Sequence, residues 1–301
     1  MSWSLHRWVW QLDAPLFIGM PPAGTLNRCR LHVLARSIWA ALTAELAQRQ
    51  TRDFPQYDDV GQRLKDYARF TYLYPAEKSA EGWLAWLPCY KTTRGLVWQR
   101  EDCRDVAGGL SDREMRNRVL DARPGTAIDS SSVTAADGTL REIDCINTRW
   151  RNPLAGPVGF AGYVLCRCDA VLKALSETGS LSLGGDTRYG LGRMRLIEWT
   201  EASNVFRKPV TRDTNIPCIR SSVVFAHAFQ HGGELQMVGA LELLVGWGRD
   251  RAGRTGMKRL HDKPLWTPGS LIPDSTAERE WEITDNGHWK LKTATPETAS
   301  A

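Results

Sequence analysis

Lysine is scarce in this chain of 301 residues, long apolar runs are missing, and the seven cysteines are odd in number and scattered. No run approaches the roughly 18 apolar residues of a membrane-spanning helix, which argues against a transmembrane segment. The N-terminus lacks the basic start and apolar run of a secretory signal, so we expect a cytoplasmic location. Scattered cysteines in such a chain argue against a disulfide framework.

Only two cysteines, Cys166 and Cys168, lie close together in the sequence. A Cys-x-Cys pair without a second pair or a nearby histidine is weak evidence for zinc, and reduced cysteine is usually a small buried side chain. We therefore predict no metal site and no cofactor.

Arginine and tryptophan are abundant. The 39 basic residues exceed the 34 acidic ones by five, and all but nine of the basic residues are arginine. The planar arginine fork bonds phosphate through two donors and stacks on bases, although a GC-rich genome would also exchange lysine for arginine. The 13 tryptophans can stack on bases or, more commonly, pack in a core.

The order of the predicted elements favours an α+β fold. The clearest helix is residues 35–50, which is rich in alanine and repeats apolar residues at spacings of three and four. Further expected elements are strands at 8–18, 162–169 and 194–199, and short strands over 83–98 that are broken by Pro88 and Gly95. Helices are expected at 58–70, 112–121 and 169–177 (capped by Asp169), and a hairpin turning at Asp137-Gly138.

This order predicts a ferredoxin-like or RRM-like βαββαβ domain over residues 1–199, with an insertion around 52–125. A β-rich region follows at 200–289, with strand candidates at 219–229 and 235–247. We expect residues 290–301 to form a disordered tail.

The segment 181–195, LSLGGDTRYGLGRMR, carries four glycines and three arginines between a predicted helix and a predicted strand. It lacks the Gly-Lys-Ser/Thr of a phosphate-binding P-loop, and a dinucleotide fingerprint would open a helix after a strand instead. A glycine-rich loop lets a ligand approach the backbone closely, and arginine binds phosphate. The alternative is a turn that only lets the helix and the strand pack.

The pattern Gly184-Gly185, Gly190 and Gly192-Arg193 after a helix resembles the glycine-rich loop of the CRISPR-associated RAMP superfamily. The segments 16–19 and 31–42 resemble that family's first strand, loop and helix, with Ala35 and Arg36 where many members have a small glycine-containing turn. Segments 126–129 and 142–146 resemble a paired segment of type III members. The resemblance covers residues 6–199 and implies an RRM-like fold that binds CRISPR RNA (crRNA).

The candidate RNA-binding residues begin with the loop and extend to other arginines. For the arginines outside the loop, a solvated face is an equal alternative. Tyr189 could stack on a base or anchor the loop in the core. The full set is Gly184, Gly185, Arg188, Tyr189, Gly190, Gly192, Arg193, Arg195, Arg36, Arg149, Arg151, Arg249, Arg251 and Arg254, with Lys258 and Arg259 in the last cluster.

No catalytic site is predicted. Members of the family that cleave CRISPR repeats generally use a histidine, and His32, just before the first helix, is the leading but weak candidate because it has no identifiable partner. Backbone subunits of type III complexes cut target RNA with a loop aspartate. Asp53, Asp58, Asp59 and Asp129 are possible by residue type, but Asp129 could equally cap a turn.

The resemblance leaves three roles open, and a generic RRM-fold module outside CRISPR biology is a further alternative. One copy of the loop, a β-rich last third and no convincing histidine favour a non-catalytic subunit that caps the 5′ handle of crRNA. Its complex would be type III or type III-derived, for example type VII. The expected partners are crRNA, other effector subunits (a repeated backbone subunit and possibly a separate nuclease) and, indirectly, target RNA. The alternatives are a repeat endoribonuclease and a repeated backbone subunit.

Overall fold

The computed structural model describes residues 2–21, 23–51, 53–102, 109–151, 156–230, 235–249, 255–273 and 278–292. Its largest sheet has nine strands. They lie in the order β13 (Ser180–Ser182), β14 (Arg193–Glu201), β1 (Ser4–Leu12), β12 (Val158–Cys166), β4 (Tyr74–Ser79), β5 (Gly82–Lys91), β6 (Gly95–Arg100) and β7 (Leu110–Ser111), and β3 (Ala68–Phe70) also pairs with β12.

The centre of this sheet is antiparallel. β1 pairs with β12 on one side and β14 on the other, and β4 follows beyond β12. Helix α1 (Ala35–Gln50) lies between β1 and β4 in the chain, and α4 (Asp169–Ser176) lies between β12 and β14. The mixture of helices with mainly antiparallel strands confirms the predicted α+β class.

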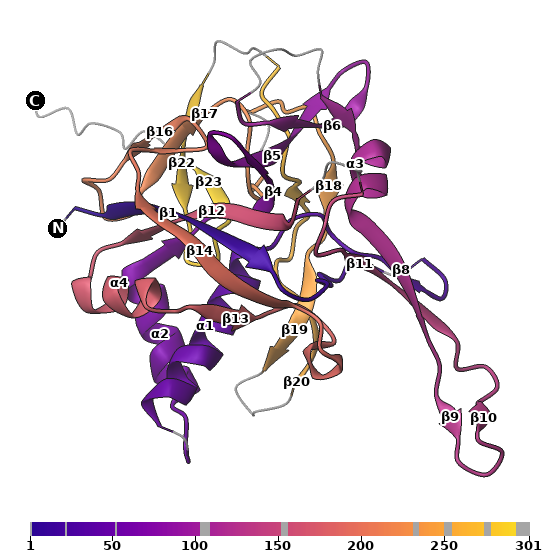
Figure 1. Cartoon of the computed structure of the whole chain (residues 1–301). Coiled ribbons are helices and arrows are strands. Elements are labelled where there is room, and N and C mark those ends of the chain that lie inside the picture. The colour runs from indigo at the N-terminus through magenta and orange to yellow at the C-terminus, as the bar shows by residue number, and fades with distance from the viewer. Residues whose placement is uncertain are drawn as a thin grey trace, which may run out of the picture.

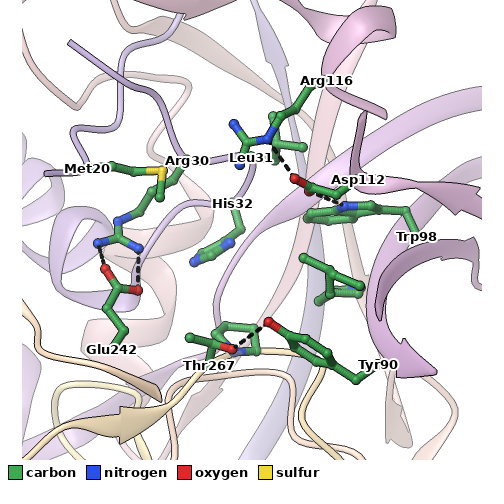
Figure 2. A pocket seen from close by; sticks show the side chains of 13 residues that line it. Met20, Arg30, Leu31, His32, Tyr90, Trp98, Asp112, Arg116, Glu242 and Thr267 are labelled. Carbon is green, nitrogen blue, oxygen red and sulfur yellow. Dashed lines mark hydrogen bonds and ion pairs between the residues drawn. The ribbon is translucent and has the colours of Figure 1, made fainter. Parts of the chain in front are cut away.

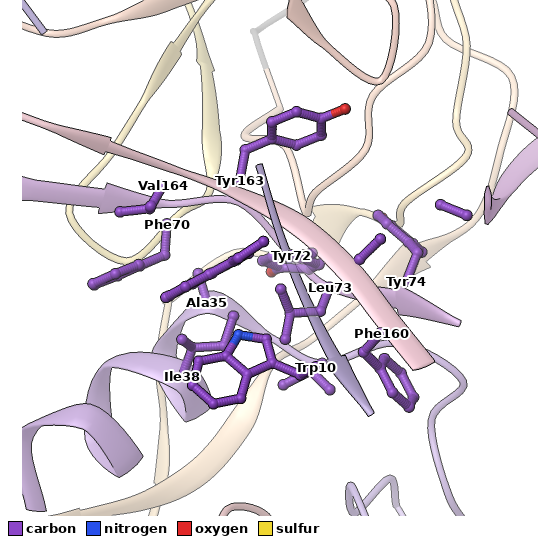
Figure 3. Close-up of a cluster of buried hydrophobic side chains, with 14 of the residues drawn as sticks. Trp10, Ala35, Ile38, Phe70, Tyr72, Leu73, Tyr74, Phe160, Tyr163 and Val164 are labelled. Atoms are coloured by element: carbon purple, nitrogen blue, oxygen red, sulfur yellow. The ribbon is translucent and has the colours of Figure 1, made fainter. Parts of the chain in front are cut away.

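The two faces of β1 pack against different parts of the chain. Trp8 and Trp10 are fully buried, and Trp10 lies close to Ile38 of α1, as Figure 3 shows. The apolar spacing of residues 35–50 thus predicts both the helix, whose bounds match, and its buried side. Most of the tryptophans that the structure describes are core residues, which is the commoner role of tryptophan.

The opposite face of the sheet is covered by the last third of the chain. The ring of Phe206 meets Tyr163 of β12 edge to face, with centroids 4.9 Å apart. Phe225 packs on Phe206, and its carbonyl accepts a 2.8 Å hydrogen bond from the Tyr74 hydroxyl. One hydrophobic core therefore spans both regions, and the boundary at 199 stays a prediction.

The last third forms short strands, so the two long strands predicted at 219–229 and 235–247 are wrong. Loops replace most of both ranges, because residues such as Val224 and Ala228 bond individually to residues 266–271 without a continuous ladder. The strands are β15 (Asn204–Val205), β16 (Lys208–Thr211), β17 (Cys218–Ser221), β18 (Leu241–Glu242), β19 (Val245–Arg249), β20 (Thr255–Arg259), β21 (Leu265–Trp266), β22 (Arg279–Ile283) and β23 (Trp289–Leu291).

A long hairpin projects from the body of the molecule (Figure 1). Its arms are β8 (Leu120–Gly125) and β11 (Arg141–Ile146), and β2 (Leu26–Asn27) joins β11 as a third strand. Near the tip, β9 (Ile128–Asp129) pairs with β10 (Thr134–Ala135). The predicted hairpin turn at Asp137-Gly138 is wrong, because the chain reverses over 130–133 and Asp137-Gly138 is a smaller turn within the returning arm.

Several further predictions change in detail. Helices α2 (Tyr57–Tyr67) and α3 (Asp112–Val119) lie close to their predicted ranges. The N-cap of α4 is Cys168 instead of Asp169. The region predicted as an insertion supplies β4 to β7, which extend the main sheet. Pro88 lies inside β5 and does not break it.

The predicted tail begins later than residue 290. Residues 290–291 belong to β23, where Lys290 pairs with Glu282, and Lys292 forms a 2.8 Å ion pair with Glu280. The remainder of the tail lies outside the described residues. Within the described part, no helix has the length and apolar character needed to cross a membrane.

Candidate functional site

The glycine-rich loop connects β13 to β14 and is held by close backbone contacts. Gly184 and Gly192 have φ of +92° and +79°, in the left-handed region that favours glycine. A Cβ at Gly192 would lie 1.9 Å from the Leu183 carbonyl oxygen, and one at Gly184 would lie 2.4 Å from the Phe17 oxygen. Side chains are therefore excluded at both positions by the chain's own backbone.

The other two glycines differ from each other. Gly185 lies against the Phe17 ring and donates a 2.8 Å hydrogen bond to the Phe17 carbonyl. Gly190 also has a positive φ, +84°, yet a Cβ there would meet nothing within 4 Å. Between them, residues 187–189 form a single 3₁₀ turn. Backbone contacts therefore hold both ends of the loop in place, and its middle, residues 187–190, is exposed.

The arginines of the segment 184–195 differ in whether their guanidinium groups have partners. Arg188 and Arg193 are exposed, and within the described residues neither guanidinium group has a hydrogen bond or an ion pair. Arg195 is also exposed, but it forms a 3.2 Å ion pair with Asp13. Arg188 and Arg193 are therefore the arginines of this segment that are available to a phosphate.

Tyr189 lies at the surface, with 74% of it exposed, so it does not anchor the loop in the core. Its ring lies 5.4 Å from the guanidinium carbon of Arg141, which comes from β11. Beside it, Leu191 packs with Ile143 and Cys145 of the same strand. The loop and the base of the projecting hairpin therefore form one surface.

Sequence reasoning missed three exposed arginines on the hairpin and its neighbour β2. Arg123 and Arg141 lie on the paired strands β8 and β11, and Arg28 follows β2. Acidic residues, such as Asp144, are interspersed among them. We call Arg28, Arg123, Arg141, Arg188 and Arg193 the arginine surface. The one signal in the sequence was the charge of residues 99–138, which includes only Arg123 of these three and equally fits a solvated face.

The other predicted arginines lie elsewhere. Arg36, on the first turn of α1, is half-buried, and burial lowers its pKa; it lies near enough to His261 and His288 to lower their pKa values as well. Arg149 and Arg151 follow β11 at the base of the hairpin, and Arg151 pairs with Asp121 at 2.5 Å. The side chain of Arg249, and Arg251 and Arg254, lie outside the described residues.

His32 lies at a cavity and is not at an exposed strand edge. Its ring stacks on Tyr72 with centroids 5.5 Å apart, and its Nε2 atom is buried without a partner among the described residues. Burial and the nearby positive charge of Arg30 hold the pKa of His32 well below its usual value. The imidazole is therefore neutral near pH 7, with one nitrogen that donates and one that accepts.

A buried polar network lies beside His32. Arg30 donates two hydrogen bonds to Glu242, one of them to Oε2 at 2.8 Å, and His227 Nε2 lies 3.1 Å from the same carboxylate. A carboxylate only accepts, so Nε2 of His227 carries its proton and Nδ1 accepts from the Tyr72 hydroxyl at 2.8 Å. This network joins the first part of the chain to the last third, and Nε of Arg30 is left without a partner among the described residues.

The candidate aspartates lie on two separate parts of the fold, the projecting hairpin and the start of α2. Asp129, near the tip of the hairpin, accepts 2.8 Å hydrogen bonds from the backbone and the hydroxyl of Ser131, which lower its pKa. It therefore caps a turn. Asp58 and Asp59 are exposed in the first turn of α2, and Asp53 is exposed just before it. Among the described residues, no cluster of three His, Cys, Asp or Glu could hold a metal ion.

The likeness to solved structures is one of fold. No protein-family model and no curated protein matches the chain. A chain in the cryo-EM structure of type III-B Cmr-beta bound to cognate target RNA and AMPPnP has a TM-score of 0.56 at 11% identity, over 89% of this chain and 85% of the other. A chain in the structure of Cmr-beta bound to cognate target RNA has a TM-score of 0.40 at 14% identity, over 65% and 96%. This chain therefore shares the fold of a chain found in a type III-B Cmr-beta complex.

Proposed function

We propose that this protein is an RNA-binding subunit of a CRISPR effector ribonucleoprotein. The observation that carries the proposal is the glycine-rich loop, which presents the unpaired Arg188 and Arg193 in a chain with the fold of a Cmr-beta chain. Arginine binds the phosphates of RNA by charge-assisted, two-donor hydrogen bonds. A turn that only joined β13 to β14 would not need these two side chains.

The proposal also includes the topology of the main sheet and the part of the surface that binds RNA. The antiparallel order β14, β1, β12, β4, with α1 and α4 as crossovers, fits the ferredoxin-like βαββαβ unit. RRM domains of this kind usually bind bases with aromatic residues on the open sheet face. Here Phe206 and Phe225 cover that face, which favours RNA binding at the loop and the hairpin.

Within such a complex, the role that fits best is a non-catalytic one, capping the 5′ handle of crRNA in a type III or type III-derived assembly in the cytoplasm. One glycine-rich loop, with a last third that packs on the same core, favours this role over a repeated backbone subunit. The burial of His32 Nε2, without a partner among the described residues, disfavours a repeat endoribonuclease. Cleavage of repeat RNA by the purified protein, lost in His32→Ala, would contradict the non-catalytic role.

Arg188→Ala should weaken binding of single-stranded RNA by about 1.5–3 kcal/mol, the range for a hydrogen bond to a charged group. Stability should hold, because the side chain is exposed and has no partner in the described structure. The measurement is RNA affinity by fluorescence anisotropy together with the thermal midpoint. Arg220→Ala, at an exposed arginine that pairs loosely with Glu278 at 3.7 Å, is the matched control. Unchanged affinity with a lowered midpoint would make the loop purely structural.

RNA binding should also weaken steeply with salt. Each phosphate that an arginine neutralises releases counterions, so log K against log salt should fall by about 0.7 per phosphate on single-stranded RNA. Arg188→Ala should make that slope shallower by about the same amount. The measurement is affinity at several salt concentrations for both proteins. A flat response in the native protein would remove the case for the arginine surface.

A further inference from the structure

A cavity of about 150 Å³ opens between the N-terminal part, the β5–β6 hairpin, α3 and the last third, beside the network of Arg30 and Glu242 (Figure 2). Its wall is largely aromatic and apolar, with His32, Tyr90, Leu96, Trp98 and Met20 among the lining residues. The volume is below the roughly 300–1,000 Å³ of ordinary ligand pockets, so the occupant must be small.

The charges around the cavity balance. On one side Arg30 is paired with Glu242, and on another Arg116 pairs with Asp112 at 2.7 Å. Asp112 also accepts a 3.0 Å hydrogen bond from the Trp98 indole. An anion would meet a carboxylate at either pair, and a cation would meet an arginine. The charge pattern therefore fits a neutral ligand with polar edges.

Two lining residues have buried nitrogen atoms without partners among the described residues, Nε of Arg30 and Nε2 of His32. Buried polar atoms are nearly always hydrogen-bonded. The described residues contain nine such unsatisfied nitrogens, and these two are the ones whose residues line the cavity. Aromatic rings together with such nitrogens suit a flat heterocycle, which stacks by its face and bonds by its edge.

The cavity is close to the glycine-rich loop along the chain. Phe17 touches Gly185 of the loop, and Met20, which donates a backbone hydrogen bond to Arg28, lines the cavity. Three residues of extended chain span about 10 Å. Arg28, in the arginine surface, is thus a backbone neighbour of the cavity residue Met20, and an RNA backbone bound at Arg28 could turn one of its bases toward the cavity.

We propose that this cavity binds a single unstacked nucleobase of the RNA held by the arginine surface. The proposal rests on the proposed function for the RNA, while the cavity itself can be tested with free nucleosides, which carry no phosphate. The base stacks against the aromatic wall, and its edge bonds to Arg30 and His32.

The test uses the full chain and two kinds of probe. The first probe is the four ribonucleosides, with indole as an aromatic compound that lacks a base edge, followed by saturation-transfer NMR. The second is a mixed-sequence single-stranded RNA of about 12 nucleotides, within the usual range of binding-site sizes. Met20→Trp fills the cavity, and Met257→Trp makes the same change at a residue 64% exposed and outside the lining. Tyr90→Leu removes an aromatic wall and serves as a second cavity variant.

At least one nucleoside should bind the native protein and Met257→Trp, bind better than indole, and fail to bind Met20→Trp. RNA affinity should fall roughly 5- to 150-fold in Met20→Trp and in Tyr90→Leu, as expected for the loss of one stacked base. RNA binding without any nucleoside binding, or with affinity unchanged in both cavity variants, would overturn the cavity proposal and leave the proposed function standing. Nucleoside binding without RNA binding would support the cavity and contradict the proposed function.

Discussion

Glu242→Ala should lower the free energy of unfolding by about 3–5 kcal/mol, because it leaves the buried Arg30 charged and without its carboxylate. Arg30 is only 5% exposed, so water cannot replace the lost partner. His227 would lose its acceptor as well, and with it the fixed tautomer that accepts from Tyr72. The measurement is chemical denaturation of the native protein and the variant.

Glu280→Ala is the matched control, since Glu280 forms a comparable ion pair with Lys292 at the surface. Its effect should stay within about 1 kcal/mol, the usual value for an exposed pair. Equal losses in the two variants would show that the Arg30–Glu242 pair is not a junction between the first part and the last third of the chain.

Acid should weaken the same junction. Burial favours a carboxyl group without charge, but the hydrogen bonds from Arg30 and His227 hold the pKa of Glu242 well below its usual value of 4.5. Burial likewise lowers the pKa of His288 from 6.5 to about 3. Both groups therefore bind protons more readily in the unfolded chain, and stability should decline as pH falls, first below 6.5 through His288 and then below 4.5 through Glu242.

The sequence predicts the parts of the fold that depend on local patterns. Residues 35–50 combine alanine with apolar residues at helical spacing, and both the helix and its bounds are as predicted. The projecting hairpin is different, because its exposed strands do not fix their own register. The chain reverses through Val133 at φ +56°, a conformation that a β-branched residue rarely adopts, so the Asp137-Gly138 signal misplaced the turn.

The candidate site was predictable only where its residues are adjacent in the sequence. The glycines and arginines of 184–193 share one loop, so their pattern is visible. Arg141 reaches Tyr189 only through pairing in the hairpin, and Arg30 lies 212 positions from Glu242. Neither pairing leaves a periodic or spaced signal. The arginine surface and the cavity therefore emerge only when the fold brings distant segments together.

Gly192→Ala should lower the free energy of unfolding by about 4 kcal/mol, combining left-handed backbone strain with displacement of the β13–β14 connection. The new Cβ would lie 1.9 Å from the Leu183 carbonyl oxygen, so the backbone must move. That movement also breaks the hydrogen bonds from Leu183 to Gly192 and from Gly192 to Pro15. Because Arg193 follows directly and Arg188 lies on the same loop, RNA affinity should fall even in the fraction that stays folded.

Gly190→Ala separates the two costs, since Gly190 has nearly the same φ but open space around its Cβ. It should lose only about 1–2 kcal/mol, the cost of left-handed backbone at a residue with a side chain. The measurements are chemical denaturation and RNA affinity for Gly192→Ala and Gly190→Ala. If both lose the same stability, the backbone approach of Gly192 to Leu183 is not what shapes the loop. If Gly192→Ala binds RNA as tightly as the native protein, the arginines do not depend on the loop's geometry, and its glycines serve packing alone.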